Sequence, residues 1–79
     1  MTNQDKKDKE KFLKNFGENI RTLRKAKGMT GAELARKCFM EKQNILKLEK
    51  GQFNPSIYYL KKIAEGLEVE FHELFKGIK

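Results

Sequence analysis

The sequence has one cysteine, one proline and no tryptophan, and it contains no long run of apolar residues. A single cysteine excludes an internal disulfide framework, a pattern that is typical of proteins in a reducing compartment. The lack of a long apolar run excludes a transmembrane helix, and the charged N-terminus does not resemble a signal peptide. We therefore expect a cytoplasmic protein with no membrane partner. The single proline leaves almost the whole chain free to form helices.

Residues that could carry out chemistry are also scarce. Cys38 and His72 lie far apart in the sequence, and neither has the neighbours expected of a paired nucleophile and base. No glycine-rich phosphate loop and no cluster of metal-ligand residues is visible. We therefore expect no enzymatic activity, no catalytic residue, no metal site and no cofactor. Cys38 is expected to be a structural residue of the core.

Positive charge, in contrast, is in excess. The 79 residues make one domain with room for a single small core, and they carry a net charge of +7 with a pI near 9.6. Most of the surplus falls within residues 14–50. Each Lys or Arg placed on a phosphate releases a counterion, so the charge favours a nucleic-acid partner. The alternative is a solvated surface with no such partner.

Residues 30–51 predict two short helices joined by a tight turn. Thr30 followed by Glu33 forms a capping box, in which the Thr hydroxyl accepts the Glu33 amide and the Glu carboxylate reaches back. A second helix is expected over about residues 41–50, and Gly51 is a typical C-terminal stop. This helix pair is the organising element of the chain.

The rest of the sequence also predicts helices. Apolar residues within 12–23 have helical spacing, another helix opens at residues 55–56, and a short fifth helix is expected near residues 70–76. Residues 1–9 have no apolar anchor and are expected to form a flexible charged N-terminal arm. The expected fold class is therefore all-α, a compact five-helix bundle over residues 10–79.

Three pieces of the sequence carry a family resemblance when they are taken in register. The pieces are Thr30-x-x-Glu33-Leu34-Ala35, Ile45-x-x-Leu48-Glu49-x-Gly51 and Asn54-Pro55-Ser56. In these pieces the chain resembles the helix-turn-helix domain of phage-repressor and Cro-type regulators, the XRE family. The resemblance implies a bundle of the phage-repressor type and a sequence-specific transcriptional regulator, such as a repressor. Its recognition helix, about residues 41–50, would dock in the major groove of double-stranded DNA.

Roles on the recognition helix follow from helical geometry and from the resemblance. When its apolar positions are directed inward, Gln43, Lys47 and Lys50 point outward. The resemblance implies that the base-reading residues are Lys42, Gln43 and Lys47. The neighbours that could contact either a base or a phosphate are Glu41, Asn44 and Leu46. Phosphate contacts are expected at Thr30, Gly31, Lys50, Ser56 and Ile57.

Arg24 and Glu49 are expected to form a structural pair. The resemblance implies that this pair joins the first helix to the recognition helix. Glu49 lies beside the core face of its helix, where a carboxylate without a partner would be costly to desolvate. The alternative is that both residues are independent surface charges.

The sequence departs from the family pattern at three positions. Gly31 replaces a Gln whose side chain grips a phosphate, so only its backbone amide could do so. Glu41 replaces the usual Ser or Thr cap of the recognition helix. Phe39 replaces a turn Gly, and a left-handed Phe would cost about 1–2 kcal/mol. We therefore expect either a different turn or a packing role for Phe39.

The final expectation concerns assembly. One recognition helix reads only a few base pairs, so a homodimer on an inverted repeat is expected, joined through residues 66–78. Some apolar residues of this segment must also cover the core, leaving one or two exposed. The expected interface residues are Val69, Phe71, Leu74 and Phe75. The alternative function is an antitoxin-like module that neutralises a partner protein and binds DNA only secondarily.

Overall fold

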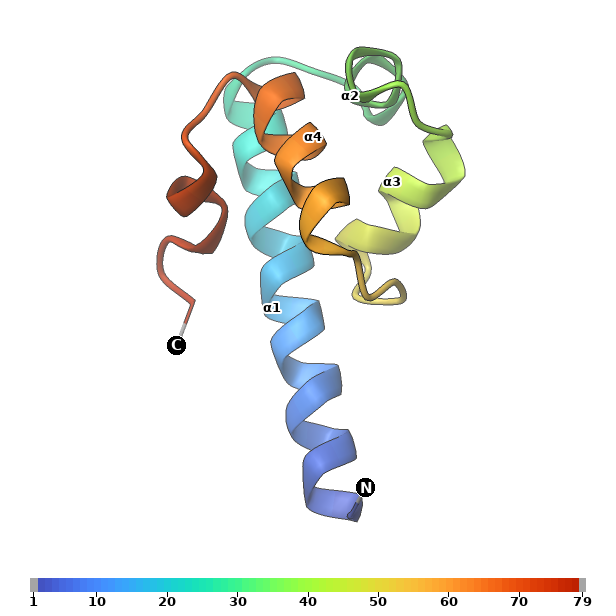
Figure 1. The fold of residues 1–79 in the computed structure, drawn as a ribbon, viewed down its shortest axis with the longest axis vertical. Helices are drawn as coiled ribbons and strands as arrows, with labels where there is room; N and C mark the ends of the chain where they lie inside the picture. The colour runs from blue at the N-terminus through green and yellow to red at the C-terminus, as the bar shows by residue number, and fades with distance from the viewer. Residues whose placement is uncertain (1, 79) are drawn as a thin grey trace.

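The computed structural model describes residues 2–78, which form helices joined by short loops and include no strand. The elements are α1 (Asn3–Ala26), α2 (Gly31–Cys38), α3 (Lys42–Glu49), α4 (Ile57–Leu67) and the 3₁₀ helix η1 (Phe71–Phe75). Figure 1 shows α1 running the length of the molecule, with the other elements gathered around its C-terminal half. The all-α class is confirmed. The count of five helices is not exact, because the short last element of the described chain winds as a 3₁₀ helix.

Helix α1 begins much earlier than the apolar pattern indicated. Thr2 caps it, with its hydroxyl accepting the Asp5 amide at 3.1 Å, and the Gln4 side chain donates to Asp8 at 3.0 Å. Residues 3–9, where the sequence predicts a flexible charged arm, are therefore part of the helix. These residues are exposed, so local bonds and not core contacts maintain this part of the helix. Met1, in the expected arm of residues 1–9, and Lys79, in the expected bundle of residues 10–79, lie outside the described residues.

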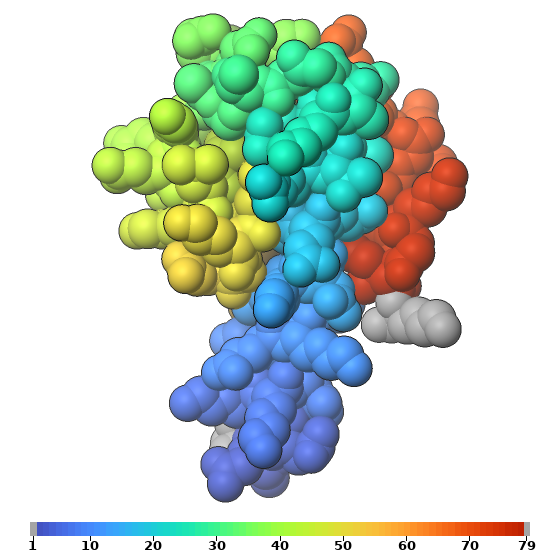
Figure 2. All heavy atoms as spheres, turned by 180° about the vertical axis from the view of Figure 1, so that it is seen from behind, coloured from blue at the N-terminus to red at the C-terminus, as the bar shows by residue number. Residues whose placement is uncertain are grey.

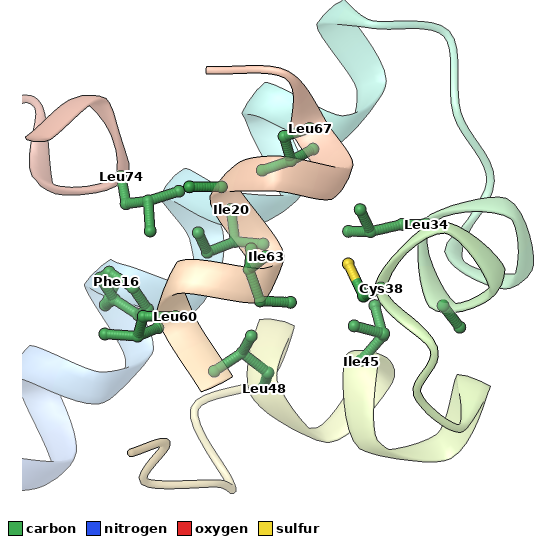
Figure 3. Close-up of a cluster of buried hydrophobic side chains, with 12 residues drawn as sticks. Phe16, Ile20, Leu34, Cys38, Ile45, Leu48, Leu60, Ile63, Leu67 and Leu74 are labelled. Atoms are coloured by element: carbon green, nitrogen blue, oxygen red, sulfur yellow. The ribbon is translucent and has the colours of Figure 1, made fainter. Parts of the chain in front are cut away.

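One hydrophobic core joins all five elements (Figure 3). Its fully buried side chains come from each element in turn and include Ile20, Leu34, Cys38, Ile45, Leu48, Ile63, Leu67 and Leu74. Burial raises the pKa of the Cys38 thiol to about 11, so the group stays protonated at neutral pH. Cys38 therefore packs as a small apolar side chain. Gly66 of α4 lies directly against it, because a Cβ there would sit 2.5 Å from its sulfur.

Two glycines allow the end of α3 to approach α1 closely. A Cβ on Gly17 would lie 2.6 Å from the Glu49 carbonyl oxygen and would overlap the Leu48 carbonyl as well. Gly51 has φ +77° and places its α-carbon beside the backbone of Lys14, where a Cβ would come within 2.7 Å. The end of α3 and the turn that follows it therefore rest directly on the α1 backbone.

The turn between α2 and α3 has the left-handed conformation that usually requires glycine. Phe39 occupies it with φ 57° and ψ 45°, so the turn does not differ in spite of the strain on a large side chain. The expected packing role is wrong, since Phe39 is 87% exposed. The ammonium of Lys62, on α4, lies 5.1 Å from the centre of its ring.

The close approach at Gly17 predicts whether a substitution there raises or lowers the stability of the protein. Replacing a glycine by alanine inside an exposed helix stabilises it by about 1 kcal/mol. At Gly17 the added methyl group would meet two backbone carbonyls that cannot move independently. We therefore expect Gly17→Ala to lower the free energy of unfolding by about 1–3 kcal/mol, measured by urea denaturation. An increase in stability would show that α1 and α3 do not approach as closely as described.

Candidate nucleic-acid interface

Helix α3 has one buried face and one exposed face. Ile45 and Leu48 are fully enclosed, and their direction defines the inner side. The exposed side chains of the helix and its C-cap are Lys42, Gln43, Lys47 and Lys50. Asn44 and Leu46 are half-buried, so they lie at the edges of the exposed face. Gln43, Lys47 and Lys50 therefore share one open surface, and Lys42 lies exposed to one side of it in the first turn of the helix.

Glu41 precedes α3 as its N-cap residue but its side chain makes no capping hydrogen bond. The first amides of α3 are consequently not covered by the residue that would ordinarily accept from them. Glu41 is exposed, and its carboxylate sits at the end of the helix where the dipole favours negative charge.

Arg24 and Glu49 form a buried, two-point ion pair. Arg24 Nε donates to Glu49 Oε2 at 2.6 Å, and Arg24 Nη2 donates to Glu49 Oε1 at 2.9 Å. Arg24 Nη1 donates to the Met29 carbonyl at 2.7 Å, a contact that nothing in the sequence pattern indicated. The hydrogen bonds to Glu49 raise the pKa of Arg24, against the opposing effect of burial. One guanidinium thus connects α1, the end of α3 and the loop before α2.

Hydroxyl side chains cap α2 and α4. Thr30 Oγ1 accepts the Glu33 amide at 3.1 Å, and the Glu33 carboxylate accepts the Thr30 amide at 3.1 Å. The hydrogen bond that the Thr30 amide donates to the carboxylate lowers the pKa of the Glu33 carboxyl. Ser56 Oγ accepts the Tyr59 amide at 3.1 Å. Both hydroxyls are exposed and keep a proton that can be donated to a phosphate oxygen. Ile57, which follows Ser56, is 77% exposed and could contribute its amide.

Gly31 and Leu46 occupy one shared space. A Cβ on Gly31 would lie 3.2 Å from the Leu46 methyl carbon Cδ2, so a longer side chain there would have to displace Leu46. Gly31 is buried and Leu46 is half-buried beside it. Gly31, where the resemblance implied a Gln, therefore lies close to a large apolar side chain of α3.

The expected interface residues divide into core and surface. Leu74 is fully buried within the chain, so its assignment to a dimer interface is corrected: it is a core residue. Val69 and Phe75 are half-buried, and the Phe75 ring lies 5.1 Å from the Phe16 ring. Phe71 is 40% exposed, with its ring 5.7 Å from that of Phe75. Phe71 and the outer side of Phe75 are the parts available to a partner.

Phe12 shares the helical spacing of the apolar residues within 12–23, but it lies outside the buried core. Its side chain is 44% exposed, beyond the end of the core. It borders an open groove of about 940 Å³ between α1 and the C-terminal segment. The residues that line the groove include Asp8, Lys9, Lys11, Glu18, Asn19, Lys76 and Ile78. Both acidic and basic side chains line it.

Other kinds of site find no support in the described part of the chain. Residues 2–78 contain no group of three His, Cys, Asp or Glu side chains placed to hold a metal ion. No described helix combines the length and apolar character that crossing a bilayer requires.

Comparisons with known proteins agree with this geometry. A family profile described as helix-turn-helix matches residues 20–74. The chain is 43% identical over 61 residues to the HTH-type transcriptional regulator SlrR of Bacillus subtilis. The aligned residues are 76% of this chain and 40% of SlrR. It is 41% identical over 56 residues to an uncharacterised HTH-type regulator of Archaeoglobus fulgidus, covering 71% of this chain and 80% of that protein. The chain thus spans less than half of SlrR.

One solved structure is similar to this chain over most of the length of both proteins. It is the restriction-modification controller protein C.AhdI from Aeromonas hydrophila, with a TM-score of 0.79 and 36% identity. The match covers 80% of this chain and 96% of that one.

The buried pair predicts a large effect of a single substitution. Glu49→Ala would leave the Arg24 guanidinium buried without its carboxylate, so we expect a loss of about 3–5 kcal/mol in the free energy of unfolding. Glu65→Ala is the matched control, because Glu65 meets Lys61 at 3.9 Å in an exposed pair within α4. That change is expected to cost no more than about 0.5 kcal/mol. Urea denaturation of both variants measures the difference, and equal small losses would contradict the description of the Arg24–Glu49 pair.

Proposed function

This chain belongs to the XRE type of the helix-turn-helix family, and from that premise we propose that it is a sequence-specific DNA-binding transcriptional regulator. The observation that carries the proposal is the two-sided character of α3. Its inner face is held by the core and by the Arg24–Glu49 pair, while its outer face presents amide and ammonium groups. Such a helix is rigidly placed and free to enter a major groove.

The exposed side chains of α3 suit the edges of base pairs. The Gln43 amide can bond adenine at N6 and N7, and the ammonium groups of Lys42 and Lys47 can bond guanine at O6 and N7. Leu46, at the edge of the face, can contact a thymine methyl group, and Asn44 and Glu41 can contact either a base or the backbone. In this proposal Lys42, Gln43 and Lys47 read sequence.

Groups around α3 suit phosphates. Lys50 stands at the C-terminal end of the helix, where a flexible ammonium can meet a backbone oxygen. The N-termini of α2 and α4 bring amides and the hydroxyls of Thr30 and Ser56 to the surface. Ile57 is exposed at the start of α4, whereas Gly31, at the start of α2, is buried. These contacts would set the orientation of α3 and carry no sequence information.

We further propose that the protein acts as a homodimer on an inverted repeat. Phe71 and Phe12 are exposed aromatic side chains on either side of Phe75, whose ring lies 5.7 Å from that of Phe71 and which lines a small pocket together with Phe12. Phe12 also borders the groove, which carries both signs of charge. A surface with apolar centre and mixed charges can be complementary to itself across a two-fold axis. Two copies of α3 would then meet half-sites about 34 Å apart.

Binding-site selection from random duplex DNA, followed by affinity measurements on the selected site, tests the regulator proposal. Gln43→Ala and Lys47→Ala are expected to lower affinity for the selected site by about 1–3 kcal/mol and to relax the preference at single base pairs. Lys50→Ala is expected to weaken selected and random duplexes alike. If all three variants weaken both duplexes equally, Gln43 and Lys47 are not base readers. If no duplex is bound, the protein is not a DNA-binding regulator.

Sedimentation equilibrium tests the homodimer. Phe71→Lys places a charge in the proposed interface and is expected to abolish self-association while leaving the fold intact, because the ring is 40% exposed. Tyr58→Lys is the matched control: Tyr58 is 64% exposed on α4, away from the groove. A wild-type protein that binds its selected site as one copy per duplex would refute the dimer.

A further inference from the structure

Helix α1 has two edges that face different neighbours. In Figure 2 it lies between the turn after α3, in yellow, and η1, in red, and its first turns extend beyond both. On the first edge, Gly17 lies beneath the last residues of α3 and the backbone of Lys14 lies beneath Gly51. On the second edge, Phe12 and Asn19 line the groove beside the C-terminal segment. The position of a residue around α1 therefore decides which neighbour it faces.

Basic residues repeat along the first edge. Lys7, Lys14 and Arg21 are seven residues apart, and seven residues complete about two helical turns, so all three project from the same side. Lys25 follows Arg21 by four residues and continues the row. We call these four residues the basic edge. All four are exposed, and among the described residues none of them forms an ion pair.

Two of the four carboxylates of α1, Asp5 and Asp8, lie away from the basic edge. Asp8 and Glu18 line the groove on the second edge, together with Lys9 and Lys11, so that side is balanced in charge. Glu10 lies beside the basic edge between Lys7 and Lys14, and Glu18 borders it from the groove side. The basic edge keeps a net positive charge in spite of these two neighbours.

The basic edge is continuous with the exposed face of α3. Lys50 immediately precedes Gly51, and Gly51 rests on the backbone of Lys14. The Thr2–Asp5 capping box begins α1 at Asn3, so Lys7 lies on the helical part of α1 that extends beyond the body of the domain. At 1.5 Å per residue, Lys7 and Lys25 are about 27 Å apart along the helix axis, which is shorter than one DNA turn of about 34 Å.

We propose that the basic edge of α1 contacts the phosphate backbone of duplex DNA flanking the base pairs that α3 reads. This inference rests on the proposed DNA binding and extends it to Lys7 and Lys14, which the helix-turn-helix match over residues 20–74 does not include. The contact is independent of sequence, since lysine and arginine meet phosphates as charges. It adds affinity and salt dependence and leaves base preference unchanged.

Two double variants of equal charge test the contact on a random-sequence duplex of 30 base pairs. Lys7→Gln with Lys14→Gln removes two charges from the basic edge, and Lys9→Gln with Lys76→Gln removes two from the lining of the groove. The first is expected to reduce the slope of log affinity against log salt by about 1.8, because each phosphate contact contributes about 0.9. The second is expected to change the slope little. Glu10→Gln should raise affinity, since it removes the carboxylate between Lys7 and Lys14.

Circular dichroism and sedimentation on each variant ensure that folded species of the same size are compared. Equal slopes for the two double variants would overturn the inference and leave the proposed function standing, because net charge alone would then account for binding. Failure of the wild-type protein to bind the duplex would overturn both. A changed base preference after Lys7→Gln and Lys14→Gln would also overturn the inference, since a phosphate contact reads no sequence.

Discussion

The buried pair of Arg24 and Glu49 is the interaction on which the position of α3 depends. A buried ion pair offsets its desolvation only if its hydrogen-bonding capacity is well satisfied. Here the guanidinium makes two bonds to the carboxylate and a third to the Met29 carbonyl. These three acceptors belong to the end of α3 and to the loop before α2. A shift of either element would leave a buried charge without its partners.

This constraint matters because α3 is short. An isolated helix of eight residues is not stable in water, so tertiary contacts must determine its position. The inner residues Ile45 and Leu48 anchor it to the core, and the bare backbone at Gly17 allows its last carbonyls to rest on α1. The outer residues of α3 then take no part in packing the core. Stability and recognition are thus assigned to opposite faces of one helix.

The same separation recurs on α1. One edge of this helix contacts α3 and carries the row of basic residues, and the other faces the groove with Phe12 and balanced charges. The proposed DNA contact and the proposed dimer contact therefore lie on different edges and do not compete for a surface. The length of α1, which begins at Asn3, extends both edges beyond the core.

The sequence by itself determined the features that depend on near neighbours in the chain. The apolar periodicity, the Thr30–Glu33 capping box and the Ser56 cap act over three or four residues, and they indicated the all-α class and the helix-turn-helix. The early start of α1 was equally local. Its capping box at Thr2 and Asp5 was present in the sequence, but the absence of apolar residues concealed it.

Only the tertiary structure decided the features that depend on how the helices are placed. Helical spacing does not show where a row of apolar residues extends past the core. Phe12 therefore had the spacing of buried residues but is exposed, and Leu74 was expected at an interface but is buried. The bond from Arg24 to the Met29 carbonyl and the closeness of Gly31 to Leu46 likewise join residues whose separation is set by packing. The physical reason is that periodicity gives the direction of a side chain from its own helix. What lies in that direction is decided by the neighbouring helices.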